Sequence, residues 1–197
     1  MVGGFGLVGC PLTMVRYLDE SGVYDLEIIS NNLGEPGKGL GVLVKKGKVK
    51  KGIGSYFTSN PDVVEAYLRG ELEIELLPQG TLAEAIRAGG AGIPAFYTSV
   101  GVGTELTKGK EERVFHNKKY TLQPSLTANF SLIKAHKADK VGNLIYTKSA
   151  RNFNPLMATA GEVVIAEVDE IVETGDLDPE AIITPHLFVD YLVVKEE

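Results

Sequence analysis

The sequence predicts a single-domain α/β layered fold, because segments with strand patterns alternate with segments with helix patterns along all 197 residues. Hydrophobic residues make up 44% of the chain and charged residues 23%, proportions typical of a soluble globular protein with one sizeable core. We find no linker, low-complexity tract or internal repeat, so residues 1–197 are expected to form one domain.

The first predicted elements are a helix and a buried strand. A helix is expected over residues 11–20, because apolar side chains recur there at every third position and share one face. The apolar run Leu26–Ile29 is expected to be a buried strand, and the polar run Ser30–Asn32 would end it.

A second helix start is encoded in Asn60, Pro61 and Asp62. Asparagine is a favoured cap residue, proline is tolerated in the first turn, and an acid there complements the helix dipole. Gly70 is expected to end this helix. Charged and apolar residues then alternate over residues 71–77, which predicts a strand with one solvent-exposed face.

A third helix is expected to begin at Thr81. Thr81 would cap it, Glu84 would complete a capping box, and Gly89 would end the helix. The polar stretch 102–119 predicts a loop or a hairpin. Further strands are expected at residues 130–135, 143–147, 162–168 and 188–194.

A glycine-rich loop, GGFGLVGCP at residues 3–11, leads into the first predicted helix. Glycine lets the backbone approach a ligand, and the positive end of the following helix would favour a phosphate or carboxylate. A tight turn without a ligand is the alternative. Such a loop normally follows a strand that aims it, yet only Met1 and Val2 precede Gly3. That strand is therefore expected to come from further N-terminal sequence or from other residues.

The run from Gly4 to Gly9 also fits the dinucleotide pattern G-x-G-x-x-G, which would indicate an oxidoreductase domain. In that fold the helix begins inside the motif, so Pro11 would fall within the helix, where proline is disfavoured. The second strand should also end in an acidic residue for the ribose, but here it ends in Ile28-Ile29-Ser30-Asn31. The sequence therefore favours another ligand, with the oxidoreductase domain as an alternative.

A second glycine-rich segment, residues 78–98, reads PQGTLAEAIRAGGAGIPAFYT. Two such turns in one small domain indicate either a cleft lined by backbone or structural crossovers between tightly packed layers. With the first loop, SNN at 30–32 and KADKVGNLIYTKSARNFNPLMA at 137–158, this segment resembles the A (alpha) subunit of family I 3-oxoacid CoA transferases. The resemblance extends from Gly3 to about Tyr191.

This resemblance implies an open, mostly parallel α/β sheet with flanking helices, similar to the fold of certain sugar-phosphate isomerases. It also implies a partner, because the A and B subunits of the family pair, usually as an A2B2 heterotetramer. In the family a glutamate attacks the acyl-CoA thioester to give an anhydride. The CoA thiolate converts this to a glutamyl-CoA thioester, which the second acid resolves. Coenzyme A is thus a substrate, and no metal or permanently bound cofactor is implied.

The family's glutamate lies in a Ser-Glu-Asn-Gly motif of the B subunit. No such string occurs here, so this chain alone is expected to be inactive. The expected exchange is between succinyl-CoA and acetoacetate, with acetate or butyrate and acetoacetate as the alternative. A sugar-phosphate isomerase that acts as one chain and a non-catalytic partner protein are further alternatives.

The resemblance assigns supporting roles to Asn31 and Gln79, which match family positions near the acyl group. An amide can donate to an oxyanion or a substrate carboxylate without being charged. A turn residue and a pre-helix residue are the structural alternatives. CoA binding is assigned to Gly3, Gly4, Phe5, Gly6, Leu7, Val8 and Gly9. A weaker assignment to the active-site wall covers Gly89, Gly90, Ala91 and Gly92. The segment Arg151–Pro155 also matches, and would pack against either the cleft or the subunit interface.

Composition disfavours several other functions. The net charge of −6 argues against a nucleic-acid partner, and no apolar run is long enough to span a membrane. Cys10 is the only cysteine, so no internal disulfide can form and a cytoplasmic location is expected. A small buried residue is the default reading of Cys10. The three histidines, His116, His136 and His186, lack metal-ligand spacing, so no metal site is expected.

Overall fold

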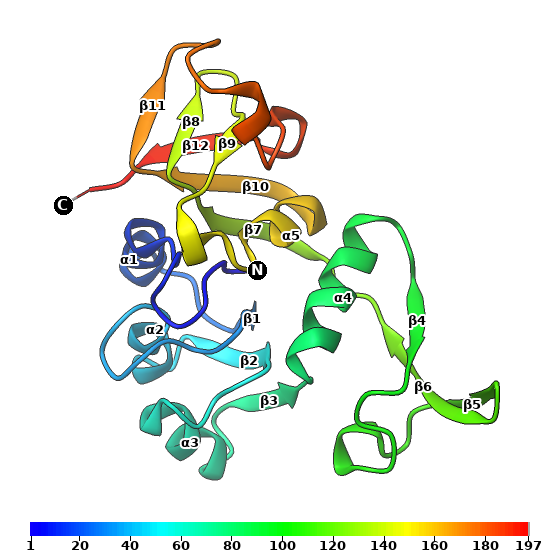
Figure 1. The fold of residues 1–197 in the computed structure, drawn as a ribbon. Helices are drawn as coiled ribbons and strands as arrows, with labels where there is room; N and C mark the ends of the chain where they lie inside the picture. Colours follow the sequence, from blue (N-terminus) through cyan, green and yellow to red (C-terminus); the bar gives the residue numbers. More distant parts are fainter. Residues whose placement is uncertain (197) are drawn as a thin grey trace.

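A computed structural model describes residues 1–196 and shows helices packed around parallel sheets (Figure 1). The α-helices are α1 (Leu12–Glu20), α2 (Gly41–Lys45), α3 (Pro61–Leu68), α4 (Gln79–Gly90) and α5 (Asn154–Ala160). The strands are β1 (Leu26–Ile29), β2 (Val49–Gly54), β3 (Glu73–Leu76), β4 (Ala95–Thr98), β5 (Glu112–Phe115), β6 (Lys118–Pro124), β7 (Ala128–Lys134), β8 (Lys137–Asp139), β9 (Leu144–Ile145), β10 (Gly161–Val168), β11 (Glu170–Val172) and β12 (Tyr191–Val194). Short 3-10 helices cover Glu105–Thr107, Lys148–Arg151, Pro179–Ala181 and His186–Phe188. Within residues 1–196, no helix has the length and apolar character needed to cross a membrane.

Two three-stranded parallel sheets form the centre of the molecule. One has the strand order β1-β2-β3, and the other has the order β12-β10-β7. The first residues of the chain lie between them. The Val2 N–H donates to the Ile29 carbonyl of β1 at 2.9 Å, and the Gly3 N–H donates to the Leu132 carbonyl of β7 at 2.9 Å. These contacts connect the two sheets into one open, mostly parallel layer, so the predicted fold class is confirmed.

Two smaller sheets extend from this centre. β8 pairs in parallel with β11 and antiparallel with β9. β6 pairs antiparallel with both β4 and β5. The β5–β6 hairpin projects away from the body of the molecule (Figure 1). It lies largely within residues 102–119, so the hairpin predicted there is confirmed.

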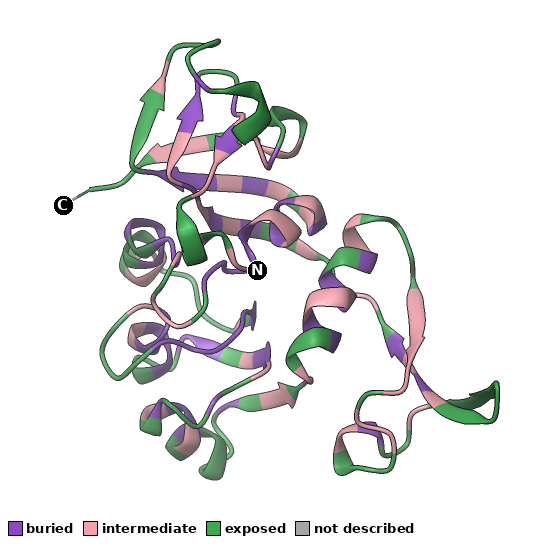
Figure 2. Ribbon diagram, in the orientation of Figure 1, coloured by how far each residue is buried: buried purple, intermediate pink, exposed green. Residues whose placement is uncertain are grey.

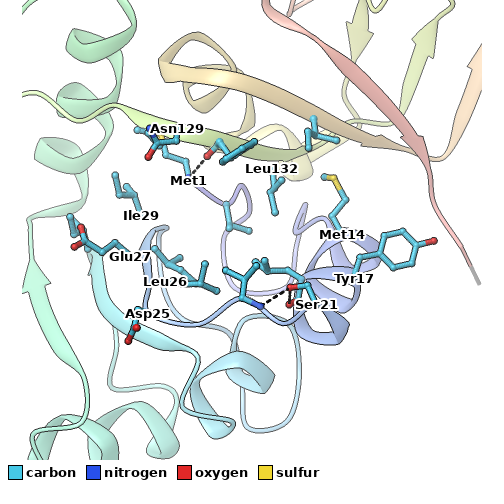
Figure 3. A pocket seen from close by; sticks show the side chains of 18 of the residues that line it. Met1, Met14, Tyr17, Ser21, Asp25, Leu26, Glu27, Ile29, Asn129 and Leu132 are labelled. Atoms are coloured by element: carbon cyan, nitrogen blue, oxygen red, sulfur yellow. Dashed lines mark hydrogen bonds between the residues drawn. The ribbon is translucent and has the colours of Figure 1, made fainter.

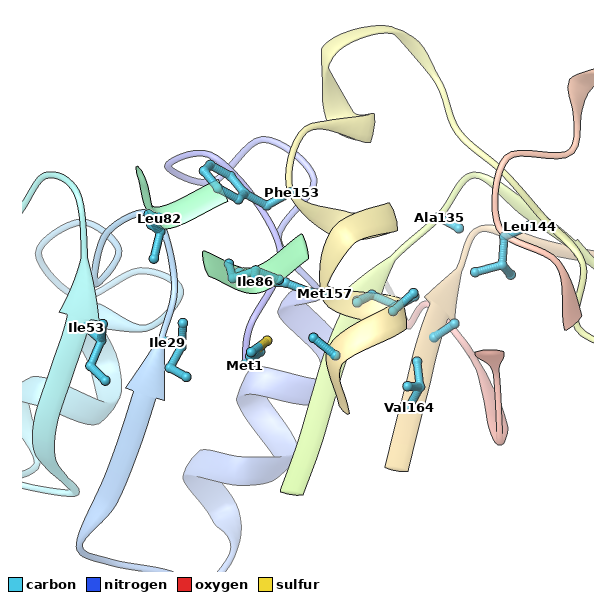
Figure 4. Close-up of a cluster of buried hydrophobic side chains, with 14 of the residues drawn as sticks. Met1, Ile29, Ile53, Leu82, Ile86, Ala135, Leu144, Phe153, Met157 and Val164 are labelled. Atoms are coloured by element: carbon cyan, nitrogen blue, oxygen red, sulfur yellow. The ribbon is translucent and has the colours of Figure 1, made fainter. Parts of the chain in front are cut away.

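Buried residues lie on the strands of the central layer and on the helices beside it (Figure 2), and their apolar side chains form two clusters. One cluster includes Leu82 and Ile86 of α4 and Met157 of α5, all with no exposed surface (Figure 4). The other includes Leu43 of α2 and Val63 of α3. Burying each large apolar side chain contributes about 1.5–3 kcal/mol, so these clusters, more than helix propensity, hold the helices against the sheets.

Most predicted elements are confirmed near their expected bounds. α1 begins one residue later than predicted, and β1 spans the predicted residues. β7 and β10 cover the strands predicted at 130–135 and 162–168 to within a few residues. The Asn60 side chain accepts a hydrogen bond from the Asp62 N–H at 3.1 Å, so the predicted cap of α3 is confirmed.

The predicted capping box at Thr81 and Glu84 is wrong. α4 begins at Gln79, directly after Pro78, so Thr81 lies inside the first turn with its side chain buried. The Glu84 carboxylate instead accepts a hydrogen bond from the Arg87 guanidinium at 2.8 Å. Pro78 has an extended backbone at the helix entry, so the cap position lies three residues before the predicted cap Thr81 (81 − 78).

Two predicted strands are shorter than expected. β9 covers Leu144–Ile145 alone within the predicted range 143–147, because its antiparallel pairing with β8 ends there. β12 starts at Tyr191 rather than at residue 188. Pro185 precedes a 3-10 turn at residues 186–188, and that turn replaces the first part of the predicted strand.

Candidate active site

The glycine loop and both predicted amide side chains lie at one edge of the central layer. Asn31 follows the carboxyl end of β1, and Gln79 follows the end of β3. The glycine loop follows Val2, which pairs in parallel with β7. Carboxyl ends of parallel strands meet at one edge of a sheet, where α/β proteins usually bind their ligands. A ligand-binding edge is therefore the natural place for these residues.

The loop itself is a tight turn stabilised by its own backbone. The Phe5 N–H donates to the Val8 carbonyl at 3.0 Å, and the Val8 N–H donates back at 3.3 Å. Gly4, Gly6 and Gly9 have φ values of +115°, +60° and +70°, a region that favours glycine. Phe5 and Val8 are 46% and 51% exposed, so neither packs in the core.

The segment 150–154 donates hydrogen bonds to the end of this turn. The sequence did not predict which part of the molecule this segment contacts. The Asn154 side chain has no exposed surface. Its Nδ2 donates to the Gly9 carbonyl at 3.0 Å, and its Oδ1 accepts from the Lys134 N–H at 2.9 Å. Asn152 Nδ2 donates to the Val8 carbonyl at 3.0 Å. The segment Arg151–Pro155 therefore packs against the glycine loop.

Asn152 has an unfavourable backbone conformation, with φ of +20° and ψ of −119°. Its side chain offsets this strain by donating to Val8 and to the Ser149 carbonyl, each at 3.0 Å. Lys148, in the same turn, has φ of +50° but no such contact to the loop. Substitutions at Asn152 and Lys148 can therefore separate the effect of backbone strain from the effect of the hydrogen bond to the loop.

Replacing Asn152 by glycine is therefore expected to lower the melting temperature by about 3 °C, because the lost hydrogen bonds outweigh the relief of strain. Lys148→Gly, the matched control, should raise the melting temperature slightly, because it relieves strain alone. Thermal unfolding followed by circular dichroism measures both. Equal shifts in the two variants would show that Asn152 does not support the loop.

The positive end of α1 is not available to a ligand, which corrects the expectation for the helix after the loop. Pro11 precedes α1 and offers no capping side chain. The Glu167 carboxylate on β10 occupies this position instead. Its Oε2 accepts hydrogen bonds from the N–H groups of Thr13 at 2.9 Å and Met14 at 3.2 Å. Any anion at this site must therefore be bound by the loop and not by the helix end.

Cys10 follows the loop and is buried. Burial, and secondarily the negative charge of Glu167, raises the pKa of its thiol to about 12. The thiol therefore stays protonated near neutral pH, and a thiolate nucleophile at this position is excluded. Cys10 acts as a small packing residue, in agreement with the sequence-based expectation.

Asn31 is 2% exposed and ties the ends of two strands together. Its side-chain Nδ2 donates to Ser55 Oγ at 2.9 Å. Its backbone carbonyl accepts from the N–H groups of Ser55 and Tyr56 at 3.0 and 3.1 Å. Gln79 is exposed at the first residue of α4. The two amides thus share an edge of the sheet, one held rigidly and the other facing solvent. Sequence reasoning missed Ser55, because a serine after a glycine-rich strand has no distinctive pattern.

The residues weakly assigned to the active-site wall lie at the C-terminal end of α4 or directly after it, away from Gln79. They are Gly89, Gly90, Ala91 and Gly92. α4 runs from Gln79 to Gly90, about 16 Å at about 1.5 Å per residue. A Cβ on Gly89 would lie 2.1 Å from the Leu126 carbonyl oxygen, and one on Gly90 would lie 2.2 Å from Thr159 Oγ1. Gly89 and Gly90 therefore serve close packing of α4 against its neighbours.

Two glutamates, Glu75 and Glu111, are partly exposed and are paired with other side chains. Glu75 pairs with Lys51 at 2.8 Å, and Glu111 accepts a hydrogen bond from Tyr97 Oη at 2.5 Å. Glu167 is the one buried glutamate within residues 1–196, and it is bound to α1. No cluster of three His, Cys, Asp or Glu side chains that could hold a metal occurs within the same residues.

A family model and the curated relatives of this sequence point to one family. The family described as Coenzyme A transferase matches residues 1–195. The chain is 50% identical to the A subunit of a probable succinyl-CoA:3-ketoacid coenzyme A transferase from Bacillus subtilis (strain 168), over 98% of this chain and 82% of that protein. It is 45% identical to the alpha subunit of the acetate CoA-transferase of Escherichia coli (strain K12), over 100% of this chain and 90% of that protein.

Solved structures share the fold. The acyl-CoA transferase (YdiF) of Escherichia coli O157:H7, in a thioester complex with CoA, superposes with a TM-score of 0.83 at 21% identity, over 98% of this chain and 43% of that chain. Glutaconate coenzyme A-transferase from Acidaminococcus fermentans gives a TM-score of 0.84 at 19% identity, over 98% of this chain and 69% of that chain. With a family match over residues 1–195 and relatives about half identical, this chain belongs to the coenzyme A transferase family.

Proposed function

We propose that this chain is the A subunit of a CoA transferase that exchanges CoA between a short acyl-CoA, with succinyl-CoA favoured, and a 3-oxoacid such as acetoacetate. One observation carries the proposal: the glycine loop, Asn31 and Gln79 lie at the same carboxyl edge in a member of this family. The relative from Bacillus subtilis is named for this activity and is 50% identical to the chain.

The glycine loop would bind CoA. Its tip exposes Phe5 and Val8, which can contact an apolar part of the ligand. Positive φ values at Gly4, Gly6 and Gly9 give the turn a backbone shape that residues with a Cβ rarely adopt. Because Glu167 already occupies the N-terminus of α1, recognition would rely on loop amides and on the shape of the turn.

Asn31 and Gln79 would stabilise the reacting acyl group. An amide nitrogen carries two N–H donors, and the Asn31 bond to Ser55 uses one of them. The other would donate to the oxygen that becomes negative when the thioester is attacked. Preorganised donors of this kind are worth about 2.7–4 kcal/mol each in well-studied enzymes.

The nucleophile would come from a partner chain. Glu75 of this chain is partly exposed and paired with Lys51, and the buried Glu167 is bound to α1. We therefore propose a B subunit that supplies a glutamate, in an A2B2 assembly. The glutamate would attack the thioester and release CoA thiolate. The thiolate would then attack the anhydride, freeing the first acid and leaving a glutamyl-CoA thioester for the second acid.

Co-expression with the adjacent reading frame tests this proposal. The purified pair should exchange CoA between succinyl-CoA and acetoacetate, whereas each chain alone should not. Exchange by this chain alone, or binding of NAD in place of CoA in a thermal-shift titration, would contradict the proposal.

A second acid pair is supported by the relative from Escherichia coli (strain K12), the alpha subunit of an acetate CoA-transferase, which is 45% identical to the chain. Acetate or butyrate with acetoacetate would then be the substrates. Pockets discriminate poorly between acids that differ by one or two methylenes, so the rates must be compared directly. A panel of succinyl-, acetyl- and butyryl-CoA at equal concentrations decides between the two pairs through kcat/KM.

In the complex, Asn31→Ala and Gln79→Ala are each expected to lower kcat by about 100-fold or more, because each removes one donor to the developing negative charge. Asn129→Ala removes an exposed amide on β7 and is the matched control, which should keep the wild-type rate. Steady-state kinetics and size-exclusion chromatography separate loss of catalysis from loss of assembly. Full activity in both variants would remove these residues from the site.

A further inference from the structure

Asn31 and Ser55 are neighbours across the carboxyl ends of β1 and β2. The last residues of the two strands pair in parallel, with Ile29 opposite Ile53. The pairing continues past the strand ends, because the Ser55 N–H donates to the Asn31 backbone carbonyl at 3.0 Å. Asn31 and Ser55 each lie two residues after the last pair, so their side chains point to the same side of the two segments.

Gly54 lets the two segments come this close. A Cβ on Gly54 would lie 2.4 Å from the Ser30 carbonyl oxygen and 3.1 Å from the Asn31 carbonyl oxygen. Any other residue at this position would push the end of β2 away from the end of β1. The Ser55 hydroxyl, one residue later, is thereby held within hydrogen-bonding distance of Asn31.

The pair lies beyond a large apolar groove that residues of α1, β1 and β7 line (Figure 3). This groove has a volume of about 810 Å³, and its lining includes Ile29 of β1 and Ile53 of β2. Asn31 and Ser55 are not among its lining residues. A change at Ser55 therefore acts at the carboxyl edge that carries the glycine loop, and leaves the groove intact.

The Ser55 hydroxyl selects one of two orientations of the Asn31 amide. A hydroxyl can donate to Oδ1 or accept from Nδ2, and a half-turn of the amide group exchanges these two atoms. Here the hydroxyl donates to the Asn31 backbone carbonyl at 3.4 Å, so its oxygen accepts from Nδ2 at 2.9 Å. Within residues 1–196, this is the one hydrogen bond of the Asn31 side chain. Without the hydroxyl, nothing in that part of the chain would fix the orientation of the amide.

We propose that Ser55 is a positioning residue for the transfer reaction, which acts through Asn31 and does not touch the substrate. It holds the Asn31 nitrogen in place and leaves the second N–H free for the oxygen of the reacting thioester. This inference rests on the proposed function, which assigns that donor to Asn31. A donor that is in place before the reaction stabilises developing charge better than one that must first rotate.

Ser55→Ala in the complex is expected to lower kcat by about tenfold and to change the KM for acyl-CoA by less than about twofold, because the positioned donor acts in the transition state. Ser55→Thr keeps the hydroxyl and should restore most of the wild-type kcat. Ser59→Ala removes an exposed hydroxyl from the same segment and is the matched control, which should keep the wild-type rate. Equal rates in Ser55→Ala and Ser59→Ala would overturn the proposal.

A double-mutant cycle separates positioning from a general structural role. In an Asn31→Ala background, Ser55→Ala should change kcat by less than about twofold, because the amide that Ser55 positions is then absent. A further loss of about tenfold in that background would show that Ser55 acts independently of Asn31, against the proposal.

A measurement on the full chain without its partner does not depend on transferase activity. The side-chain amide protons of Asn31 are identified by NMR as the pair that Asn31→Ala removes. Their hydrogen exchange should be faster by about tenfold in Ser55→Ala and unchanged in Ser59→Ala. If the complex exchanges no CoA, the proposed function fails while this measurement still tests the positioning. Unchanged exchange of these protons in Ser55→Ala would refute the role of Ser55 even in an active transferase.

Discussion

Replacing Glu167 by alanine is expected to lower the free energy of unfolding by about 3 to 5 kcal/mol, the range for breaking a buried charge pair. Glu167 is 1% exposed on β10. Its carboxylate accepts from the N–H groups of Thr13 and Met14 and lies 3.5 Å from Lys134 Nζ. Alanine would leave two helix N–H groups buried without an acceptor and would remove a partner of a largely buried ammonium group.

Urea denaturation followed by circular dichroism measures this loss. Glu65→Ala is the control, because Glu65 forms an exposed ion pair with Arg69 and should change stability by about 0.5 kcal/mol or less. Glu167→Gln should fall between the two, since an amide oxygen can still accept from α1. If Glu167→Ala costs no more than Glu65→Ala, the carboxylate does not hold the start of α1.

Several elements that depend on neighbouring residues could be predicted from the sequence, whereas contacts between distant residues could not. The cap of α3 was predictable because Asn60 and Asp62 are two residues apart. The acceptor at the start of α1 was not, because Glu167 lies 154 residues from Thr13. In the sequence, the start of α1 after a glycine loop therefore resembled a free anion site. In the fold, the Glu167 carboxylate occupies that position.

β2 was not predicted from the sequence for a second reason, which is that its residues lack a strand pattern. Its sequence, VKKGIG, has neither clean alternation nor an apolar run. Gly52 and Gly54 are there because neighbours approach closely: a Cβ would lie 2.8 Å from Leu33 Cδ1 and 2.4 Å from the Ser30 carbonyl oxygen. Tight packing selects glycine over the β-branched residues that usually identify a strand.

The candidate site also combines residues that the sequence predicted with a contact that it did not predict. The resemblance to a family pointed to the glycine loop, Asn31 and Gln79, and the structure brings all three to one edge of the sheet. The support of that loop by Asn154 depends on a hydrogen bond to Gly9, 145 residues away. Periodicity and local motifs carry no information about such a contact, which only the packed fold reveals.

Replacing Gly9 by alanine is expected to cost about 3 to 5 kcal/mol, because strain and overpacking add. Gly9 has φ of +70°, where a Cβ is disfavoured. A Cβ would also lie 2.3 Å from the Ala150 carbonyl oxygen and 2.9 Å from Asn152 Nδ2. The glycine loop or the segment 150–154 must move to accept it.

Gly37→Ala isolates the strain from the packing. Gly37 has φ of +68°, almost the same as Gly9, but a Cβ there would have no neighbour within 4 Å. It should cost about 1 to 2 kcal/mol in urea denaturation, and the remaining loss in Gly9→Ala then measures the contact with the segment 150–154. In the complex, Gly9→Ala should also raise the KM for acyl-CoA, whereas Gly37→Ala should leave it unchanged. Equal losses of stability in the two variants would show that the segment yields easily. The loop would then not be held rigidly enough to position CoA.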